Sequence, residues 1–285
     1  MRQNILLDEM IKKELSDDVA SFSYLRSFSE ELITCDLKIK SPLLLSGIDF
    51  FCRVFSWMNE ANEEKISSLK ELEGQSFFHL KKGDVQTISF LLPMQDAIMG
   101  ERLALNLLSR SSAVSTATYK VRARMDELGF QGVALLDTRK TTPLFRFLEK
   151  YAVTVGGGKN HRFSQTDALM IKDNHKVLLG GLKEALTYFR QQCGFYTPIV
   201  LEIHNIEELE MALSESVKHL MLDNFTPEMI KEAVLLKRPG VTYELSGGLN
   251  LDNLSLFLQQ GIDAISMGAL THNPPAVDFS LKMRR

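Results

Sequence analysis

Cysteine, tryptophan and proline are scarce in this chain of 285 residues, which contains three Cys, one Trp and eight Pro. Cys35, Cys52 and Cys193 lie far apart and show no paired spacing, which argues against a disulfide framework or a structural zinc site. We therefore expect the chain to reside in a reducing cytosol.

An excess of one charge and long apolar runs are also missing. The formal net charge is −3, so the chain has no general attraction for nucleic acid, and any positive field must come from local clusters of Lys and Arg. No run reaches the ~18 apolar residues of a membrane span, and the charged N-terminus lacks the apolar core of an export signal. We expect a cytoplasmic protein without nucleic-acid or membrane partners.

The first third of the chain mixes helical and strand patterns. Helices are expected at 4–15, 47–58 and 101–129, and strand-like stretches at 37–45, 76–80 and 87–92. From Gly132 onward, strands alternate regularly with helices, which is typical of βα units with a parallel sheet. The expected strands are 132–137, 167–172, 198–203, 219–223, 242–246 and 263–268. Six units are too few for an eight-unit barrel, so an incomplete barrel and an open doubly wound sheet both remain possible.

Polar or glycine residues stand at the end of each expected strand. Basic residues belong to the earlier units and carboxylates to the later ones, in the order Arg139, Lys140, Arg162, Lys172, Glu202 and Asp223. Because the loops after parallel strands converge on one face, we expect these residues to share one cavity. Arg and Lys match carboxylates or phosphates, whereas carboxylates match a metal ion, sugar hydroxyls or a developing cation.

The last two units end in Ser246-Gly247-Gly248 and Met267-Gly268. Without side chains, such positions allow backbone N–H groups to approach a phosphate. The pattern therefore predicts a cavity that binds an anionic group on one side and a sugar phosphate on the other.

Longer motifs resemble those of the quinolinate phosphoribosyltransferase family. They are DTRKTTPLFRFLEKYAV from Asp137, GGGKNHR from Gly156, then ALMIKDNH, LDNF, SGG and GALTH in the family's order, preceded by ERLALN from Glu101. Together they cover most of residues 98–281. Leu144 stands where the family usually has Gly, and FSQTD at 163–167 replaces a common LGLSD pattern.

The resemblance implies an N-terminal α/β sandwich, residues 1–110 joined by 273–285, and an incomplete parallel α/β barrel, residues 111–272. It also implies a homodimer or larger homo-oligomer that converts quinolinate and phosphoribosyl pyrophosphate to nicotinate mononucleotide in NAD biosynthesis. By resemblance, the substrate-binding positions are Arg102 of a neighbouring subunit, Thr138, Arg139, His161, Arg162, Lys172, Ser246, Gly247, Gly248, Met267 and Gly268. Lys140, Glu202 and Asp223 would be catalytic, the two carboxylates holding Mg²⁺ directly or indirectly.

Simpler roles exist for the histidines. His161 could cap or pack, although its place after three glycines favours the site, and His175 could either orient its loop or touch substrate. His79, His204 and His219 belong to no motif and are expected to be structural or at the surface. Two alternatives to the main function remain: a related phosphoribosyltransferase with another acceptor such as nicotinate, and a non-catalytic sugar-phosphate binding protein.

Overall fold

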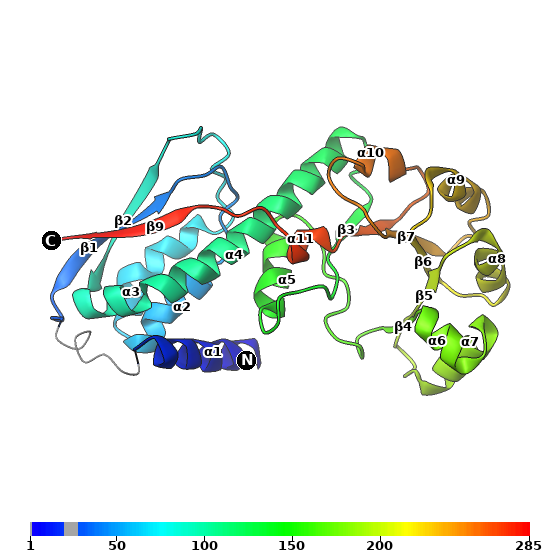
Figure 1. Cartoon of the computed structure of the whole chain (residues 1–285), viewed down its shortest axis with the longest axis horizontal. Helices are drawn as coiled ribbons and strands as arrows, with labels where there is room; N and C mark the ends of the chain where they lie inside the picture. The colour runs from blue at the N-terminus through cyan, green and yellow to red at the C-terminus, as the bar shows by residue number, and fades with distance from the viewer. Residues whose placement is uncertain (1, 20–27) are drawn as a thin grey trace. The chain divides into compact units, whose positions relative to one another are not determined.

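The computed structural model describes residues 2–19 and 28–285, and the chain divides into two compact units (Figure 1). The first comprises Met1–Ala117, Pro143–Gly156 and Pro274–Arg285, and the second Thr118–Thr142 and Gly157–Asn273. The boundary expected after residue 110 falls inside the long helix α4 (Met94–Glu127). The first unit also includes Pro143–Gly156, which lies within the range expected for the barrel domain.

The first unit contains a three-stranded antiparallel sheet in the order β2-β1-β9. Its strands are β1 (Leu32–Ile39), β2 (Gln86–Pro93) and β9 (Phe279–Arg284). Side chains alternate between buried and accessible along β1, as a strand with one face on a core requires. Asp36 on β1 accepts hydrogen bonds from Ser89 of β2 and Arg284 of β9, so one carboxylate joins all three strands.

The helices of this unit supply the rest of its core. They are α1 (Arg2–Val19), α2 (Ile48–Met58), α3 (Asn62–Ile66), the 3₁₀ helix η2 (Ser67–Leu72), the first part of α4, and α5 (Arg146–Val155). The strand expected at 76–80 is wrong. Phe77 and Leu80 are both buried at a spacing of three, and Leu80 N–H donates to the Phe77 carbonyl at 3.1 Å, so this segment forms turns.

The second unit contains a six-stranded parallel sheet in the order β3-β8-β7-β6-β5-β4. The strands are β3 (Ala134–Leu136), β4 (Leu169–Ile171), β5 (Ile199–Ile203), β6 (His219–Asp223), β7 (Thr242–Ser246) and β8 (Ala264–Ser266). From β4 to β8 each new strand is added at the same edge, and β8 then pairs with the first strand, β3. In a doubly wound sheet, the edge at which new strands are added changes part-way along the chain. No such change occurs here, so the incomplete barrel is confirmed, and the barrel is open between β3 and β4.

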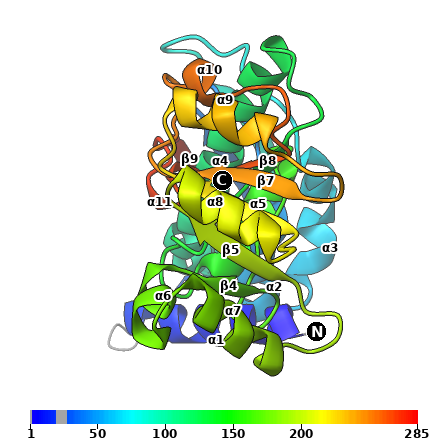
Figure 2. The same cartoon turned by 90° about the vertical axis from the view of Figure 1, so that its right-hand side faces the viewer.

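Helices α7 (Leu182–Gln192), α8 (Ile206–Ser214) and α9 (Pro227–Leu235) cover the outer face of this sheet (Figure 2). Their starts follow from local sequence. The Asn205 side chain accepts the Glu208 N–H at 2.8 Å, and the Thr226 side chain accepts the Met229 N–H at 3.3 Å just before Pro227. A further helix of the second unit, α10, is short and spans only Leu254–Phe257.

All three cysteines are free. Burial raises the pKa of the Cys35 thiol to about 11 and that of the Cys52 thiol to about 12, so both behave as apolar core residues. Across residues 2–19 and 28–285, no helix has the length and apolarity needed to cross a bilayer.

Candidate active site

A cavity of about 650 Å³ lies in the second unit, where the carboxyl ends of the parallel strands meet. Every predicted site residue except Arg102 lines it. The predicted convergence of the strand ends is therefore observed. Residues that the sequence did not suggest also line the cavity: Met170, Met221, Leu249, Ser266, Ala269, His272 and Asn273.

Arg139 and Arg162 form a cationic wall. Burial, followed by the positive charge of nearby Arg139, lowers the pKa of the Arg162 guanidinium. Arg162 Nη1 donates to the Ala168 carbonyl at 2.8 Å, whereas Arg139 Nε is buried and has no hydrogen-bond partner among the described residues. Two neighbouring guanidiniums with an unsatisfied buried donor favour an anion, and their planar forks match carboxylates.

His161 is held firmly at the same wall. Its backbone N–H donates to Asp137 Oδ1 at 2.8 Å, and its Nδ1 accepts the Arg162 N–H at 2.8 Å. Because Nδ1 is an acceptor, the proton lies on Nε2, which is 3.4 Å from Glu244 Oε2. Glu244 on β7 was not predicted, although it lies two residues before Ser246, which lines the cavity.

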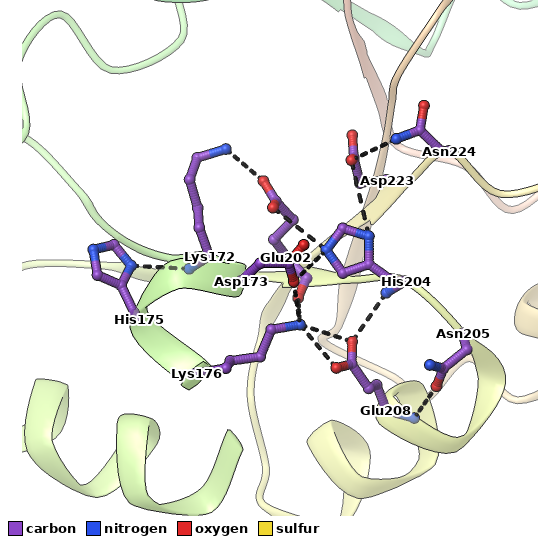
Figure 3. Close-up of polar contacts among 10 residues, drawn as sticks. All are labelled: Lys172, Asp173, His175, Lys176, Glu202, His204, Asn205, Glu208, Asp223 and Asn224. Atoms are coloured by element: carbon purple, nitrogen blue, oxygen red, sulfur yellow. Dashed lines mark hydrogen bonds and ion pairs between the residues drawn. The ribbon is translucent and has the colours of Figure 1, made fainter. Parts of the chain in front are cut away.

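The carboxylate side of the cavity is formed by Glu202 at the end of β5 and Asp223 at the end of β6. Figure 3 shows the ring of His204 between them. His204 Nε2 lies 3.5 Å from Glu202 Oε1, and Nδ1 lies 3.9 Å from Asp223 Oδ2. The expectation that His204 has only a structural or surface role overlooked its spacing of two from Glu202, which places alternate residues on the same side of an extended segment.

A polar network continues behind these carboxylates (Figure 3). Lys176 Nζ on α6 (Asp173–Leu179) contacts Asp173 Oδ1 at 3.0 Å, both oxygens of Glu208 at 2.8 and 2.9 Å, and the Glu202 carbonyl at 3.3 Å. His175 Nδ1 accepts the Lys172 N–H at 3.0 Å, so His175 orients the loop after β4.

Metal-binding capacity centres on the same groups. Asp173, Glu202 and His204 place ligand atoms within 4.8 Å of one another. A nitrogen ligand suits Mg²⁺ poorly, and Lys176 and Lys172 already accompany Asp173 and Glu202. Carboxylate oxygens suit Mg²⁺, and both Glu202 and Asp223 line the cavity.

Glycines form the remaining wall. Gly247 has φ 95°, and a Cβ there would lie 2.2 Å from Asn224 Oδ1 and 2.8 Å from its backbone N. A Cβ at Gly268 would lie 2.9 Å from Lys140 Cδ, so the missing side chain leaves room for the lysine stem. A Cβ at Gly248 would meet nothing within 4 Å, because this residue faces the open cavity.

Arg102 differs from the other predicted residues. It lies on the part of α4 that belongs to the first unit, its side chain is exposed, and its guanidinium is 3.8 Å from Glu101. Its predicted role required a neighbouring subunit, so it stays a prediction.

Comparison with known proteins decides the family. A model of the quinolinate phosphoribosyl transferase C-terminal domain matches residues 114–282. The chain belongs to the quinolinate phosphoribosyl transferase family. It is 34% identical to the probable nicotinate-nucleotide pyrophosphorylase (carboxylating) of Bacillus subtilis, covering 89% of this chain and 84% of that protein. The human nicotinate-nucleotide pyrophosphorylase (carboxylating) is 36% identical over 86% of this chain and 80% of its own.

Solved structures of quinolinate phosphoribosyl transferase relatives agree. NadC from Streptococcus pyogenes is 31% identical, with a TM-score of 0.84 over 98% of this chain and 96% of that one. The nicotinate-nucleotide pyrophosphorylase from Francisella tularensis is 28% identical, with a TM-score of 0.82 over 99% and 97%. All cavity-lining residues, from Thr138 to Asn273, fall within the region matched by the family.

Proposed function

We propose that this protein transfers phosphoribose from phosphoribosyl pyrophosphate to quinolinate and releases carbon dioxide, yielding nicotinate mononucleotide for NAD biosynthesis. The observation that carries the proposal is that one cavity brings together the cations Arg139, Arg162 and Lys172 and the carboxylates Glu202 and Asp223. A monoanionic acceptor offers one carboxylate to these cations, whereas an aromatic diacid offers two, which suits a site with several cations.

The cationic side would hold the diacid. Arg139 has a buried Nε–H without a hydrogen-bond partner in the described part of the chain, and its positive charge repels that of Arg162. A carboxylate bound between the two would accept a hydrogen bond from Arg139 and reduce this repulsion. Lys172 enters from the end of β4 and reaches the second carboxylate as a mobile point charge. Buried Met170 and Met221 supply an apolar lining for the flat ring.

The opposite side would hold the sugar diphosphate. Ser246, Gly247 and Gly248 offer backbone donors to the 5-phosphate, with Thr138, Met267 and Gly268 at the adjoining strand ends. Lys140, whose carbonyl accepts from Thr271 Oγ1 at 2.8 Å, contributes its ammonium to the pyrophosphate. Glu202 and Asp223 would bind Mg²⁺, directly or indirectly, and the bound ion would neutralise charge on the leaving pyrophosphate.

The reaction follows from where charge develops. As the bond between the anomeric carbon and pyrophosphate breaks, positive charge grows on the ribose, and Glu202 and Asp223 stabilise it. The pyridine nitrogen, held in place by the arginines, then bonds to that carbon and becomes cationic. The adjacent carboxylate leaves as carbon dioxide because the carbanion formed on the ring is stabilised by the neighbouring positive nitrogen. This carbanion then takes up a proton from water, which gives nicotinate mononucleotide.

The proposal includes a homodimer or larger homo-oligomer in a reducing cytoplasm. An exposed Arg102 on α4 is available for a neighbour's site, and three free cysteines suit a reducing compartment. Gel filtration with light scattering tests the assembly: a monomer that is fully active would remove the role of Arg102.

The decisive experiment is the release of labelled carbon dioxide from quinolinate, with phosphoribosyl pyrophosphate and Mg²⁺ added separately and together. We expect release only when both are present. Incubation with nicotinate instead distinguishes the related transferase, and binding of phosphoribosyl pyrophosphate without any turnover of either acid would identify the non-catalytic alternative.

A further inference from the structure

Two lysines one helical turn apart, Lys172 and Lys176, are held in opposite ways (Figure 3). The side chain of Lys176 is only 9% exposed and contacts Asp173, Glu208 and the Glu202 carbonyl. The side chain of Lys172 is 46% exposed, and its ammonium is paired with Glu202. Lys176 is therefore a fixed structural cation, whereas Lys172 can exchange its partner for a ligand at little cost.

Glu202, the partner of Lys172, is buried and therefore cannot lose its cation at little cost. The side chain of Glu202 is 9% exposed, and its other oxygen lies 3.5 Å from His204 Nε2. A buried carboxylate that loses its cation pays a desolvation penalty until another cation replaces it. Release of Lys172 should therefore raise the affinity of Glu202 for a metal ion or a cationic centre.

Lys172 belongs to the cations proposed to bind the diacid, and Glu202 belongs to the carboxylates proposed to act on the second substrate. While they are paired, Lys172 is withheld from the diacid and Glu202 from the Mg²⁺ and ribose of the other substrate. Each ligand thus competes with the same internal ion pair rather than with the other ligand.

We propose that the Lys172–Glu202 ion pair couples the two substrate subsites, so that a diacid bound to Lys172 frees Glu202 and tightens binding of Mg²⁺–phosphoribosyl pyrophosphate. This inference rests on the proposed function. Linkage makes the effect reciprocal, so the second substrate also tightens binding of the diacid. The Lys176–Glu208 pair joins α6 to α8 and does not involve the exposed Lys172.

The sign of this coupling is diagnostic. Simple repulsion predicts that an anionic diacid weakens binding of a polyanionic second ligand in the same cavity. Exchange of an ion pair predicts the opposite, because the diacid removes an internal competitor from Glu202.

The first test is calorimetric titration of the full-length protein with phosphoribosyl pyrophosphate at fixed Mg²⁺, with and without saturating phthalate. Phthalate carries two adjacent carboxylates but no ring nitrogen, so it cannot react. We expect phthalate to lower the Kd about 5- to 150-fold, the usual range for coupled sites. An unchanged or raised Kd, or a failure of phthalate to bind, would overturn the coupling alone; failure of phosphoribosyl pyrophosphate to bind would overturn the proposed function as well.

A second test uses Lys172→Met without any diacid. By Coulomb's law alone, loss of a cation should weaken the binding of a polyanion. If the ion pair exchanges, however, loss of the competitor for Glu202 should strengthen the binding of Mg²⁺–phosphoribosyl pyrophosphate to the level reached with phthalate. Lys183→Met is the matched control, since Lys183 is exposed, lies 3.8 Å from Glu215 and does not line the cavity; its Kd should not change. If folded Lys172→Met binds Mg²⁺–phosphoribosyl pyrophosphate more weakly than the unaltered protein, the proposed exchange of the Lys172–Glu202 pair is refuted. If the variant does not fold, the phthalate titration still tests the coupling by itself.

Discussion

Replacement of Gly247 by Ala is the sharpest structural test of the glycine wall. The new Cβ would lie 2.2 Å from Asn224 Oδ1 and 2.8 Å from the Asn224 backbone N. Rotation of the Asn224 side chain relieves the first clash but not the second, so the strand end itself must move. Overpacking of this kind costs ~1–3 kcal/mol. The φ of 95° adds a left-handed backbone penalty of ~1–2 kcal/mol for a residue with a Cβ.

We therefore expect Gly247→Ala to lose ~2–5 kcal/mol of unfolding free energy, measured by urea denaturation with linear extrapolation. Gly248→Ala is the matched control, because its φ of 59° carries the backbone penalty while its Cβ meets nothing within 4 Å. It should lose only ~1–2 kcal/mol. It should nevertheless weaken phosphoribosyl pyrophosphate binding, since the added methyl occupies the cavity. Equal stability losses in the two variants would refute the steric argument at Gly247.

Three further variants test other parts of the structure. Leu144 has φ 65° and is 73% exposed, so Leu144→Gly should raise stability by ~1 kcal/mol; a lower midpoint in thermal unfolding would contradict this. Arg139→Lys keeps the charge but loses the fork, and we expect the KM for quinolinate to rise about tenfold or more while the KM for phosphoribosyl pyrophosphate stays within about twofold. Lys176→Met should cost ~1–3 kcal/mol, because it leaves the partly exposed Glu208 carboxylate without its buried cation, and the double variant with Glu208→Leu should recover most of this loss; equal losses in single and double variants would rule out the ion pair as the cause.

Much of the barrel could be predicted from local pattern. Most of the six parallel strands are short, mainly apolar runs, whereas β7 alternates between polar and apolar residues, and each strand lies within its expected range. The failures have a local cause as well. Phe77 and Leu80 look like a strand in composition, but their spacing of three places both in the core only if the chain turns between them. Leu144 was identified as a departure from the family resemblance, which predicts glycine there, and its positive φ is a conformation that glycine adopts without strain.

Part of the candidate site could likewise be predicted from local sequence, and part could not. Residue type and position at a strand end were enough to predict that Arg139, Lys172 and Glu202 would share one cavity, because the geometry of parallel βα units leaves few alternatives. The spacing of His204 from Glu202 was a local signal, but its distance from Asp223 and the contact of Glu244 with His161 could not be predicted. Those contacts join different strands, and no local pattern carries the distance between them.

The sequence by itself determined the class of fold, the family and the kinds of groups at each strand end, because these depend on periodicity and residue chemistry along the chain. Only the tertiary structure decided which charges neutralise one another. Lys176 and Lys172 are both lysines at the start of one helix, yet one is buried among Glu208 and its neighbours and the other is half-exposed beside Glu202. Burial and distance set the strength of an ion pair, and both are properties of the packed molecule.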